Sequence, residues 1–291
     1  MIISSAKERE FLTSGKDSNY LRPLKPSFIL NCIICETATQ EVFRAKILGK
    51  YEAPYFECPS CGFLRVPDPF WLAESYASAI TALDIGLIKR NLELREVVTA
   101  IIRTYFDTSG KFVDYGGGYG MLVRLLRDRG LDFYRQDIYA ENLFARNFDL
   151  ADTNCAKFEV LTAFEVFEHL ENPVAEVKKM LELSDNILFS TELQPRPHPT
   201  PDTWWYILPE IGQHISFFSR HSLEALAQRM GLHLSSNGKN LHILSRRKIS
   251  APLLFRVLSY HQIAGLFNAV LPGRKSLLPQ DFKMLKRRLN S

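Results

Sequence analysis

The segment between residues 111 and 130 constrains the fold of this chain more than any other feature. A short apolar run, KFVDY, leads into three glycines, Gly116, Gly118 and Gly120, and the amphipathic stretch MLVRLLRDRG follows them. This pattern predicts a strand, a tight turn and a helix. Because glycine has no Cβ, a ligand can approach the backbone of such a turn closely and lie beside the helix N-terminus. The segment therefore predicts an α/β domain with a cofactor site at the turn.

An acid at the end of the next apolar run narrows the class of cofactor. The run LDFYRQD predicts a second strand that ends at Asp137, 21 positions after Gly116, where a carboxylate can accept hydrogen bonds from ribose hydroxyls. The dinucleotide pattern G-x-G-x-x-G needs glycine or alanine at its last position, which is Met121 here. Asp114 and the three glycines instead fit D-x-G-x-G-x-G, a form that resembles motif I of class I S-adenosylmethionine methyltransferases.

The resemblance to these methyltransferases extends beyond the turn. Residues 158–173 look like the segment that follows motif I in the family, a fourth strand with an E-V-hydrophobic-E-H-hydrophobic stretch after it. A helix and a fifth strand at 186–191 come next, Ser219 can cap a further helix, and a β-hairpin is expected across Asn237–Gly238. The resemblance covers about residues 90–247. It implies a Rossmann-like sheet of seven mostly parallel strands, the last one antiparallel, with helices on both faces.

The same resemblance implies roles for the residues that match its motifs. Asp114 and the three glycines would border the amino-acid part of S-adenosylmethionine, and Asp137 would hold the ribose. Phe164 or Glu165 would line the adenine pocket. The third strand is poorly marked in residues 141–158, which leaves open the residue that reads the adenine amine.

Four of the five cysteines form two C-x-x-C hooks, Cys32–Cys35 and Cys58–Cys61, with 22 residues between them. A two-residue gap lets both thiolates of a hook reach one tetrahedral ion at about 2.3 Å. The pattern favours a structural zinc site over a redox dithiol pair, because a single redox motif does not normally come with a matched partner. Four thiolates leave no open coordination position, so we expect the zinc to serve folding rather than catalysis.

An unusual insert, residues 191–219, follows the fifth strand and contains five prolines, two adjacent tryptophans and two histidines. Long loops at the carboxyl ends of strands hold the ligands of open α/β sheets, so this insert is the expected acceptor lid. Trp204, Trp205 and Tyr206 would form an apolar wall, with Tyr206 as a candidate catalytic residue. His214 is the candidate general base, because an ordinary histidine pKa of about 6.5 suits proton removal near neutral pH.

The residues around His214 also bear on the acceptor. They are similar to the H-x-S-hydrophobic-hydrophobic-S stretch of zinc-containing sugar C-methyltransferases, which begin with a cysteine-rich region as well. This partial likeness implies a small polar acceptor, a sugar nucleotide or another glycan precursor, and leaves the acceptor atom open. A structural His214, tied to backbone groups beneath the lid, is the alternative. Glu168 and His169 have two readings too, an active-site pair or a helix-start carboxylate beside a packed histidine.

The chain is expected to divide into five parts. These are an N-terminal segment (1–25), the zinc ribbon (26–70), a helical linker that covers the cofactor (71–110), the methyltransferase domain (111–248) and a C-terminal helical tail (249–291). Within the linker, Tyr76, Asp84 and Arg90 would reach the active site or form a solvated face. In the tail, Pro272, Gly273 and Pro279 separate a basic part from an apolar part. This separation favours a tail packed on the domain over a peripheral helix on a membrane surface.

Composition sets limits on the partners and the compartment. The chain has 36 Lys and Arg against 32 Asp and Glu, a net charge of +4, which does not favour nucleic-acid binding. The sequence contains no signal peptide or membrane-spanning run, so a cytoplasmic protein is expected. The leading hypothesis is an S-adenosylmethionine-dependent methyltransferase for a small acceptor. The alternatives are a non-catalytic binding module, disfavoured by the intact motif residues, and an RNA or protein methyltransferase, disfavoured by the few cations of the ribbon.

Overall fold

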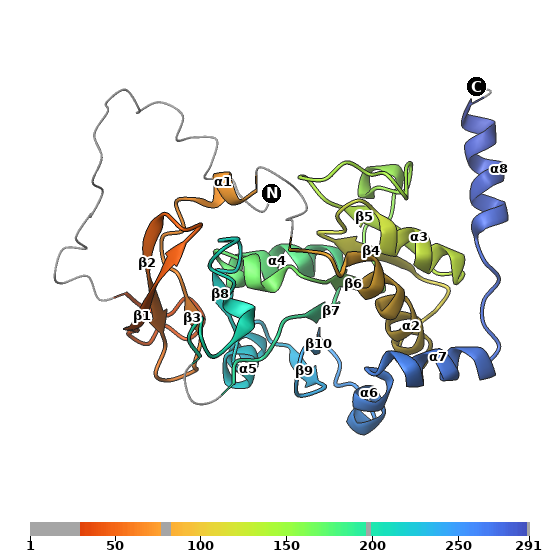
Figure 1. Cartoon of the computed structure of the whole chain (residues 1–291). Coiled ribbons are helices and arrows are strands. Elements are labelled where there is room, and N and C mark those ends of the chain that lie inside the picture. The colour runs from red at the N-terminus through yellow and green to blue at the C-terminus, as the bar shows by residue number, and fades with distance from the viewer. Residues whose placement is uncertain (1–29, 77–82, 196–198, 290–291) are drawn as a thin grey trace.

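The computed structural model describes residues 30–76, 83–195 and 199–289. The N-terminal segment expected at residues 1–25 lies outside these ranges. A six-stranded sheet in the order β5-β4-β6-β7-β10-β9 forms the centre of the molecule (Figure 1). Its strands are β4 (Lys111–Tyr115), β5 (Asp132–Gln136), β6 (Val160–Ala163), β7 (Asn186–Ser190), β9 (His233–Ser236) and β10 (Leu241–Ser245).

The strand directions confirm the predicted α/β class. Strands β4 to β7 pair in parallel, whereas β10 runs antiparallel to both β7 and β9. The hairpin between β9 and β10 turns at Gly238, whose φ of 85° lies in the left-handed region that glycine adopts without strain. The expected antiparallel last strand is therefore present.

The described residues contain six strands of this sheet where seven were expected. Beside β5, where a third parallel strand would lie, a single bridge joins Arg135 to Asp149. The Arg135 guanidinium also pairs with the Asp149 carboxylate at 2.6 Å. The chain around it forms turns, because the Asn142 side chain bonds the backbone of Ala145 and residues Leu150–Asp152 form the short 3-10 helix η1. A polar side chain that bonds its own backbone competes with strand pairing, which explains the lost strand.

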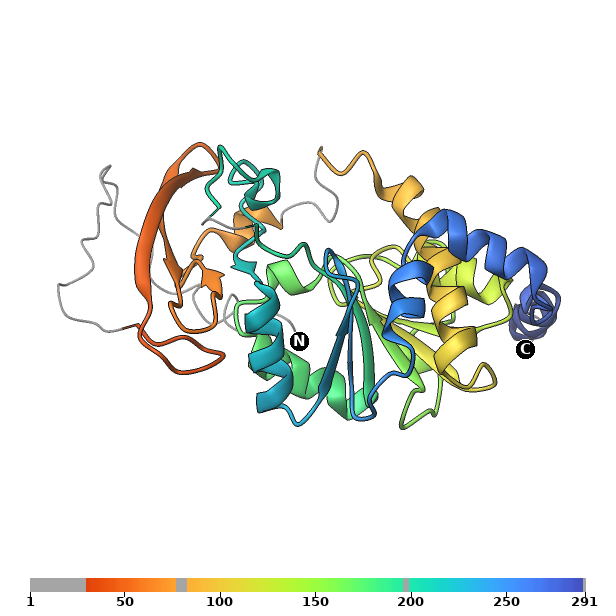
Figure 2. The same ribbon diagram turned by 90° about the horizontal axis from the view of Figure 1, so that it is seen from below.

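Two layers of helices cover the sheet (Figure 2). Successive residues of a strand point to opposite faces, so Phe112 of β4 packs with one layer and Val113 with the other. One layer contains α2 (Leu87–Tyr105), α3 (Met121–Asp128), α6 (Pro252–Leu258) and α7 (His261–Val270), and the opposite layer contains α4 (Pro173–Leu183) and α5 (Arg220–Arg229). The last helix, α8 (Leu278–Leu289), lies at the end of the molecule beside α3.

A second, antiparallel sheet contains the ribbon and part of the insert. It has the order β1-β2-β3-β8, with β1 (Gln40–Ile47), β2 (Tyr51–Glu57), β3 (Leu64–Arg65) and β8 (Ser216–Phe217). Its core includes Trp71, which precedes the short helix α1 (Leu72–Ser75), and Ile207 of the insert. The ribbon and the insert are therefore one packed unit although about 150 residues separate them in the sequence.

Among the described residues, no helix is long and apolar enough to cross a bilayer.

Candidate active site and metal centre

The glycine turn between β4 and α3 is the first element of the site. Gly116, Gly118 and Gly120 have φ values of 70°, 52° and 82°, all in the left-handed region. A Cβ on Gly116 would lie 2.7 Å from a methyl group of Val166, and one on Gly120 would lie 2.7 Å from Asn142 Oδ1. A Cβ on Gly118 would meet no protein atom within 4 Å. Gly116 and Gly120 are thus required by packing, whereas the backbone at Gly118 is open to a ligand.

Asp114 lies behind the turn with only 4% of its surface exposed. Its Oδ1 accepts a hydrogen bond from Thr162 Oγ1 at 2.6 Å. Burial raises the pKa of the Asp114 carboxyl to about 7, although the Thr162 hydrogen bond opposes this shift. A cationic ligand group in the cleft would favour the ionised form of this acid.

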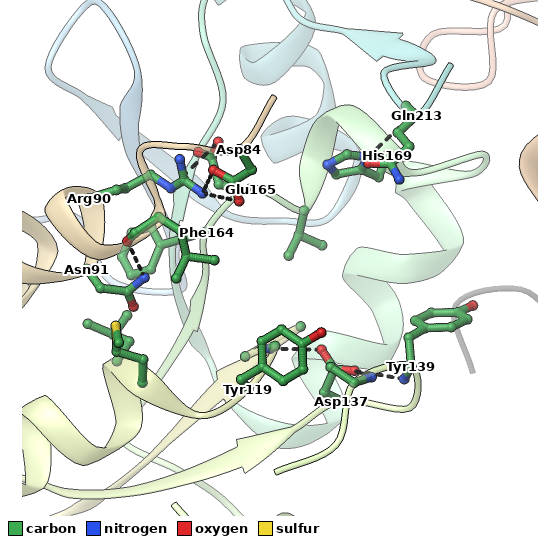
Figure 3. A pocket seen from close by; sticks show the side chains of 18 of the residues that line it. Asp84, Arg90, Asn91, Tyr119, Asp137, Tyr139, Phe164, Glu165, His169 and Gln213 are labelled. Carbon is green, nitrogen blue, oxygen red and sulfur yellow. Dashed lines mark hydrogen bonds and ion pairs between the residues drawn. The ribbon is translucent and has the colours of Figure 1, made fainter. Parts of the chain in front are cut away.

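Asp137 directly follows β5, and its carboxylate faces the cleft that the glycine turn also lines (Figure 3). Its Oδ2 accepts from the Gly118 amide at 2.9 Å, and its Oδ1 accepts from the amides of Tyr139 and Ala140, both at 2.8 Å. A carboxylate offers about four lone-pair sites, so these three bonds fix its orientation and leave acceptor capacity for a ligand hydroxyl.

Arg90 of α2 lies on the wall of the cleft that faces Asp137. Arg90 Nη2 lies 3.0 Å from Asp84 Oδ1, and Arg90 Nε lies 4.0 Å from Glu165 Oε2 (Figure 3). Glu165 has a φ of 55°, and the Ser190 hydroxyl accepts from its amide at 2.9 Å. A non-glycine residue in the left-handed region is strained, which is common at functional sites. Phe164, the residue before it, also lines this wall.

One cavity of about 540 Å³ joins the glycine turn to the insert. Small-molecule sites usually measure about 300–1,000 Å³, so this volume suits a ligand pocket. The cavity brings together all the cofactor and catalytic residues predicted from the sequence except Gly120, namely Asp114, Gly116, Gly118, Asp137, Phe164, Glu165, Tyr206 and His214.

Two histidines form the far end of this cavity. The rings of His169 and His214 are 5.0 Å apart, nearly perpendicular. His214 Nδ1 lies 2.6 Å from the carbonyl oxygen of Tyr206, and His169 Nδ1 lies 3.0 Å from that of Gln213. A carbonyl oxygen only accepts, so both Nδ1 atoms carry the hydrogen and both Nε2 atoms keep a lone pair. Burial lowers the pKa of His214 to about 4 and that of His169 to about 3, so both rings are neutral at neutral pH.

A buried acid lies beside the two histidines. Glu168 is 0% exposed, and neither of its carboxylate oxygens has a hydrogen-bond partner among the described residues. Burial and the nearby Glu165 charge raise its pKa well above the ordinary value. The Tyr206 hydroxyl is also buried without a partner in the described part of the chain. Ligand atoms of Glu168, His169 and His214 lie within 4.8 Å of one another, which also meets the distance requirement for a metal ion.

The two adjacent tryptophans have different surroundings. Trp205 is 67% exposed and lines the cavity beside Tyr206. Trp204 is 8% exposed and packs edge-on against Phe217 in the core of the second sheet, with ring centroids 5.7 Å apart. The expected aromatic wall therefore consists of Trp205 and Tyr206, while Trp204 belongs to the hydrophobic core that the insert shares with the ribbon.

The four paired cysteines meet at one point of the ribbon. Cys32 Sγ lies 3.7 Å from Cys61 Sγ, Cys35 Sγ lies 3.4 Å from Cys58 Sγ, and all four sulfurs lie within 4.8 Å of one another. Tetrahedral thiolates at about 2.3 Å from zinc would be separated by about 3.8 Å, so the observed spacing fits a zinc ion. The four residues fit a structural zinc site better than a redox dithiol pair.

Several residues that line the cavity had no assigned role in the sequence. Gln213 and Tyr139 belong to this group. Tyr76, for which the sequence allows either an active-site position or a solvated face, also lines the cavity. The Tyr76 ring stacks on that of Tyr139 with centroids 5.9 Å apart and meets the His169 ring edge-on at 6.2 Å. The Glu168–His169 pair carried a sequence signal, because it lies in the segment after motif I. No periodicity marked Tyr139 or Gln213.

Comparison with known proteins gives a family match. Residues 88–237 match a family model described as a methyltransferase domain. A search of curated proteins found no match.

The chain is also similar, at low sequence identity, to several solved structures of methyltransferases. The magnesium protoporphyrin IX methyltransferase ChlM from Synechocystis PCC 6803, solved with bound SAH, is 15% identical, with 60% of this chain and 92% of that chain covered and a TM-score of 0.40. The plantazolicin methyltransferase BpumL is 13% identical, with 62% and 91% covered and a TM-score of 0.39. The mitomycin 7-O-methyltransferase MmcR is 15% identical, with a TM-score of 0.38; 53% of this chain matches about half, 54%, of its length.

Proposed function

The chain belongs to the methyltransferase-domain family. We propose that it transfers the methyl group of S-adenosylmethionine to a small polar acceptor. The family membership confirms the class predicted from the glycine motif. The observation that carries the proposal is the single cavity that connects Gly118 and Asp137 to His214. A methyltransferase needs such continuity, because the nucleophile must approach the methyl carbon in line with the bond that breaks.

We assign the cofactor to the half of the cavity that the glycine turn borders. Asp137, with acceptor capacity left on its carboxylate, would accept from the ribose hydroxyls, and the open backbone at Gly118 would lie against the cofactor. Asp114 and the turn would border the amino-acid part. Phe164 and Glu165 would lie near the adenine, since both line the same wall.

We assign the acceptor to the half that the insert borders. The polar residues that line this half are His169, Tyr206, Gln213 and His214, and the two histidines keep a lone pair on Nε2. Several hydrogen-bonding groups beside the exposed ring of Trp205 suit a hydroxyl-rich ligand. A sugar nucleotide or another glycan precursor is the acceptor class we propose.

His214 is the proposed general base of the reaction. Its Nδ1–H is held by the Tyr206 carbonyl, so the neutral ring presents Nε2 to the acceptor. Bound S-adenosylmethionine would supply an electrophilic methyl group on sulfur, and His214 Nε2 would take the proton that the acceptor atom loses. A metal ion bound by Glu168, His169 and His214 would occupy Nε2 instead, so metal content separates these two chemistries.

Calorimetry and turnover test this proposal together. S-adenosylmethionine should give a heat of binding with the zinc-replete protein, and labelled cofactor should transfer its methyl group to one of a panel of nucleotide sugars. His214→Ala should reduce turnover by about 10²–10⁴-fold and leave cofactor affinity unchanged. His221→Ala, on the exposed face of α5, is the matched control and should be neutral. No heat of binding would point to a non-catalytic module, and an equal loss of turnover and affinity would make His214 structural.

A further inference from the structure

The C-terminal tail has a charge that differs from the rest of the chain. Residues 246–291 contain ten Lys and Arg but only one acid, Asp281, so this segment carries +9 while the preceding 245 residues carry −5. Asp281 is 2% exposed and pairs with Arg124 at 2.8 Å and Arg127 at 2.7 Å. The side-chain charge that the tail presents to solvent is therefore entirely positive.

Helix α7 has two apolar faces. One face packs on α2 through the buried Ala264 and through Phe267, and the Asn268 amide donates to the Glu96 carbonyl oxygen at 2.9 Å. The second face points to solvent with Ile263 and Leu266, which are 42% and 66% exposed. No Lys, Arg, Asp or Glu occurs in the helix. A surface helix of an ordinary globular protein has one polar face, so the second apolar face of α7 needs a separate explanation.

The neighbouring helices extend the exposed apolar set. The described structure exposes 21 large hydrophobic side chains, and ten of them belong to α6, α7, α8 and the segments between these helices. This part of the sequence, residues 253–289, is only about an eighth of the chain. We call these ten side chains the tail surface: Leu253, Leu254, Tyr260, Ile263, Leu266, Val270, Leu271, Leu278, Phe282 and Leu289. Exposed apolar side chains in such numbers mark an interaction site where one partner can cover them together.

Cations flank the tail surface along the chain. Arg256 of α6 precedes α7, Arg274 and Lys275 follow it, and Lys283 and Lys286 lie beside Phe282 on α8; all five cations are exposed. Aliphatic side chains next to Lys and Arg are typical of helices that lie in the headgroup region of a bilayer. Cations near an anionic leaflet add an attraction that falls off within about 10 Å at 0.1 M salt.

We propose that the tail surface docks this protein on an anionic membrane. One side of the tail packs on the domain, as the sequence favoured, and the other side is free for lipid. The charge disfavours a second copy of the chain as the occupant, because two C-terminal segments that each carry +9 repel each other. The tail surface also suits nucleic acid less well than lipid, because aliphatic side chains such as Leu266 and Val270 neither stack on bases nor bind phosphate.

Vesicle sedimentation with the full chain tests the proposal. Phosphatidylcholine vesicles that contain 30% phosphatidylglycerol should bind the protein at 0.1 M salt, and vesicles of pure phosphatidylcholine should bind it at least about tenfold more weakly. Binding to the anionic vesicles should fall steeply at 1 M salt. Equal binding to both vesicle types, or none to either, would overturn the proposal.

Two paired variants separate the apolar and the cationic contributions. Leu266→Ser with Val270→Ser, and Lys283→Glu with Lys286→Glu, should each weaken vesicle binding by at least about tenfold. Their controls are the exposed positions Val42→Ser with Leu92→Ser, and Lys89→Glu with Lys178→Glu, which should bind like the wild type. Unchanged melting temperature and S-adenosylmethionine calorimetry show that each variant is folded.

Two further measurements test the rival occupants. A dimer in analytical ultracentrifugation that Leu266→Ser with Val270→Ser dissolves would replace the membrane by a second copy of the chain. Tight binding to a single-stranded oligonucleotide that both tail variants abolish would replace it by nucleic acid. A monomer with weak, salt-sensitive oligonucleotide binding is the expected result.

Discussion

The backbone amide of Val66 donates to the carbonyl oxygen of Ile215 at 2.9 Å and so joins the four-cysteine ribbon to the segment that carries the candidate base. The Ile215 amide in turn donates to the carbonyl oxygen of Glu168 at 2.9 Å. His214, the residue before Ile215, is thus held between the second sheet and the loop after β6. Ser219 strengthens this attachment, since its hydroxyl donates to the Cys61 carbonyl oxygen at 2.7 Å. The ribbon therefore supports the half of the cavity that the insert borders, which we propose for the acceptor.

Loss of the proposed zinc should affect the acceptor half before the cofactor half. Cys58→Ser should lower the zinc content from one ion per chain to none and abolish turnover, because the strands that hold Ile215 lose their support. S-adenosylmethionine affinity should change little, since Gly118 and Asp137 lie directly after β4 and β5 of the central sheet, outside the ribbon. Metal analysis, turnover and calorimetry on the same sample check this.

Cys155→Ser is the matched control for the zinc prediction, because Cys155 lies outside the four-cysteine cluster. It should keep both zinc and activity. A Cys58→Ser protein that loses cofactor affinity and turnover together would contradict the division of the cavity. Two metal ions per wild-type chain, one of them removed by His169→Ala, would assign the second ion to the cluster of Glu168, His169 and His214.

The backbone at Gly118 offers a selective test of the cofactor site. Gly118→Ala adds a methyl group that meets no protein atom within 4 Å but enters the space assigned to S-adenosylmethionine. We expect at least about tenfold weaker cofactor binding by calorimetry with a loss of stability of only about 1 kcal/mol, the usual cost of alanine in this backbone region.

Gly231→Ala separates backbone strain from the lost approach. Gly231 has a φ of 65°, and a Cβ there also meets no atom within 4 Å, but the residue ends α5 far from the cavity. This variant should show the same small loss of stability and normal cofactor affinity. Equal S-adenosylmethionine affinities of the Gly118→Ala and Gly231→Ala variants would contradict the proposal that the cofactor binds at the glycine turn.

The elements that the sequence predicted correctly share a local cause. The glycine turn, the Ser219 cap and the hairpin at Gly238 each depend on residues a few positions apart, so spacing alone reveals them. The pairing of β3 with β8 joins residues about 150 positions apart, and β8 is only two residues long, too short for a periodic pattern. The association of the ribbon with the segment around His214 was therefore not predictable from the spacing. The sequence marks the cysteines and His214 individually, but not their proximity.

Asp114 should make the stability of the ligand-free protein depend on pH. Its folded pKa of about 7 lies above the ordinary value near 4, so between these limits the unfolded chain is ionised while the folded carboxyl keeps its proton. The unfolded state then binds fewer protons, and stability falls as the pH rises from about 4 to about 7, by up to roughly 4 kcal/mol. Above pH 7 this contribution is constant.

Asp114→Asn isolates this contribution. The amide oxygen can still accept from Thr162, and the side chain cannot ionise. Urea unfolding between pH 4 and pH 8 should show a shallower pH dependence for the variant than for the wild type, with the variant relatively more stable at pH 8. Parallel curves for the two proteins would show that Asp114 is ionised in the fold at all these pH values.

The ion pair between Arg127 and Asp281 should fix the tail to the domain. Both side chains are 3% exposed, and the Arg127 guanidinium contacts Asp281 with two nitrogens at 2.7 and 2.9 Å. Asp281→Ala would leave the buried Arg127 charge with Asp132, a backbone carbonyl and the rings of Tyr134 and Phe148 as partners, and loss of one partner of a buried pair costs about 3–5 kcal/mol. The remaining contact with Asp132 places our expectation near the lower end, about 3 kcal/mol, in urea unfolding. Glu224→Ala removes an exposed partner of Arg220 and should cost less than about 1 kcal/mol, so similar losses in the two variants would show that the tail is not held by this pair.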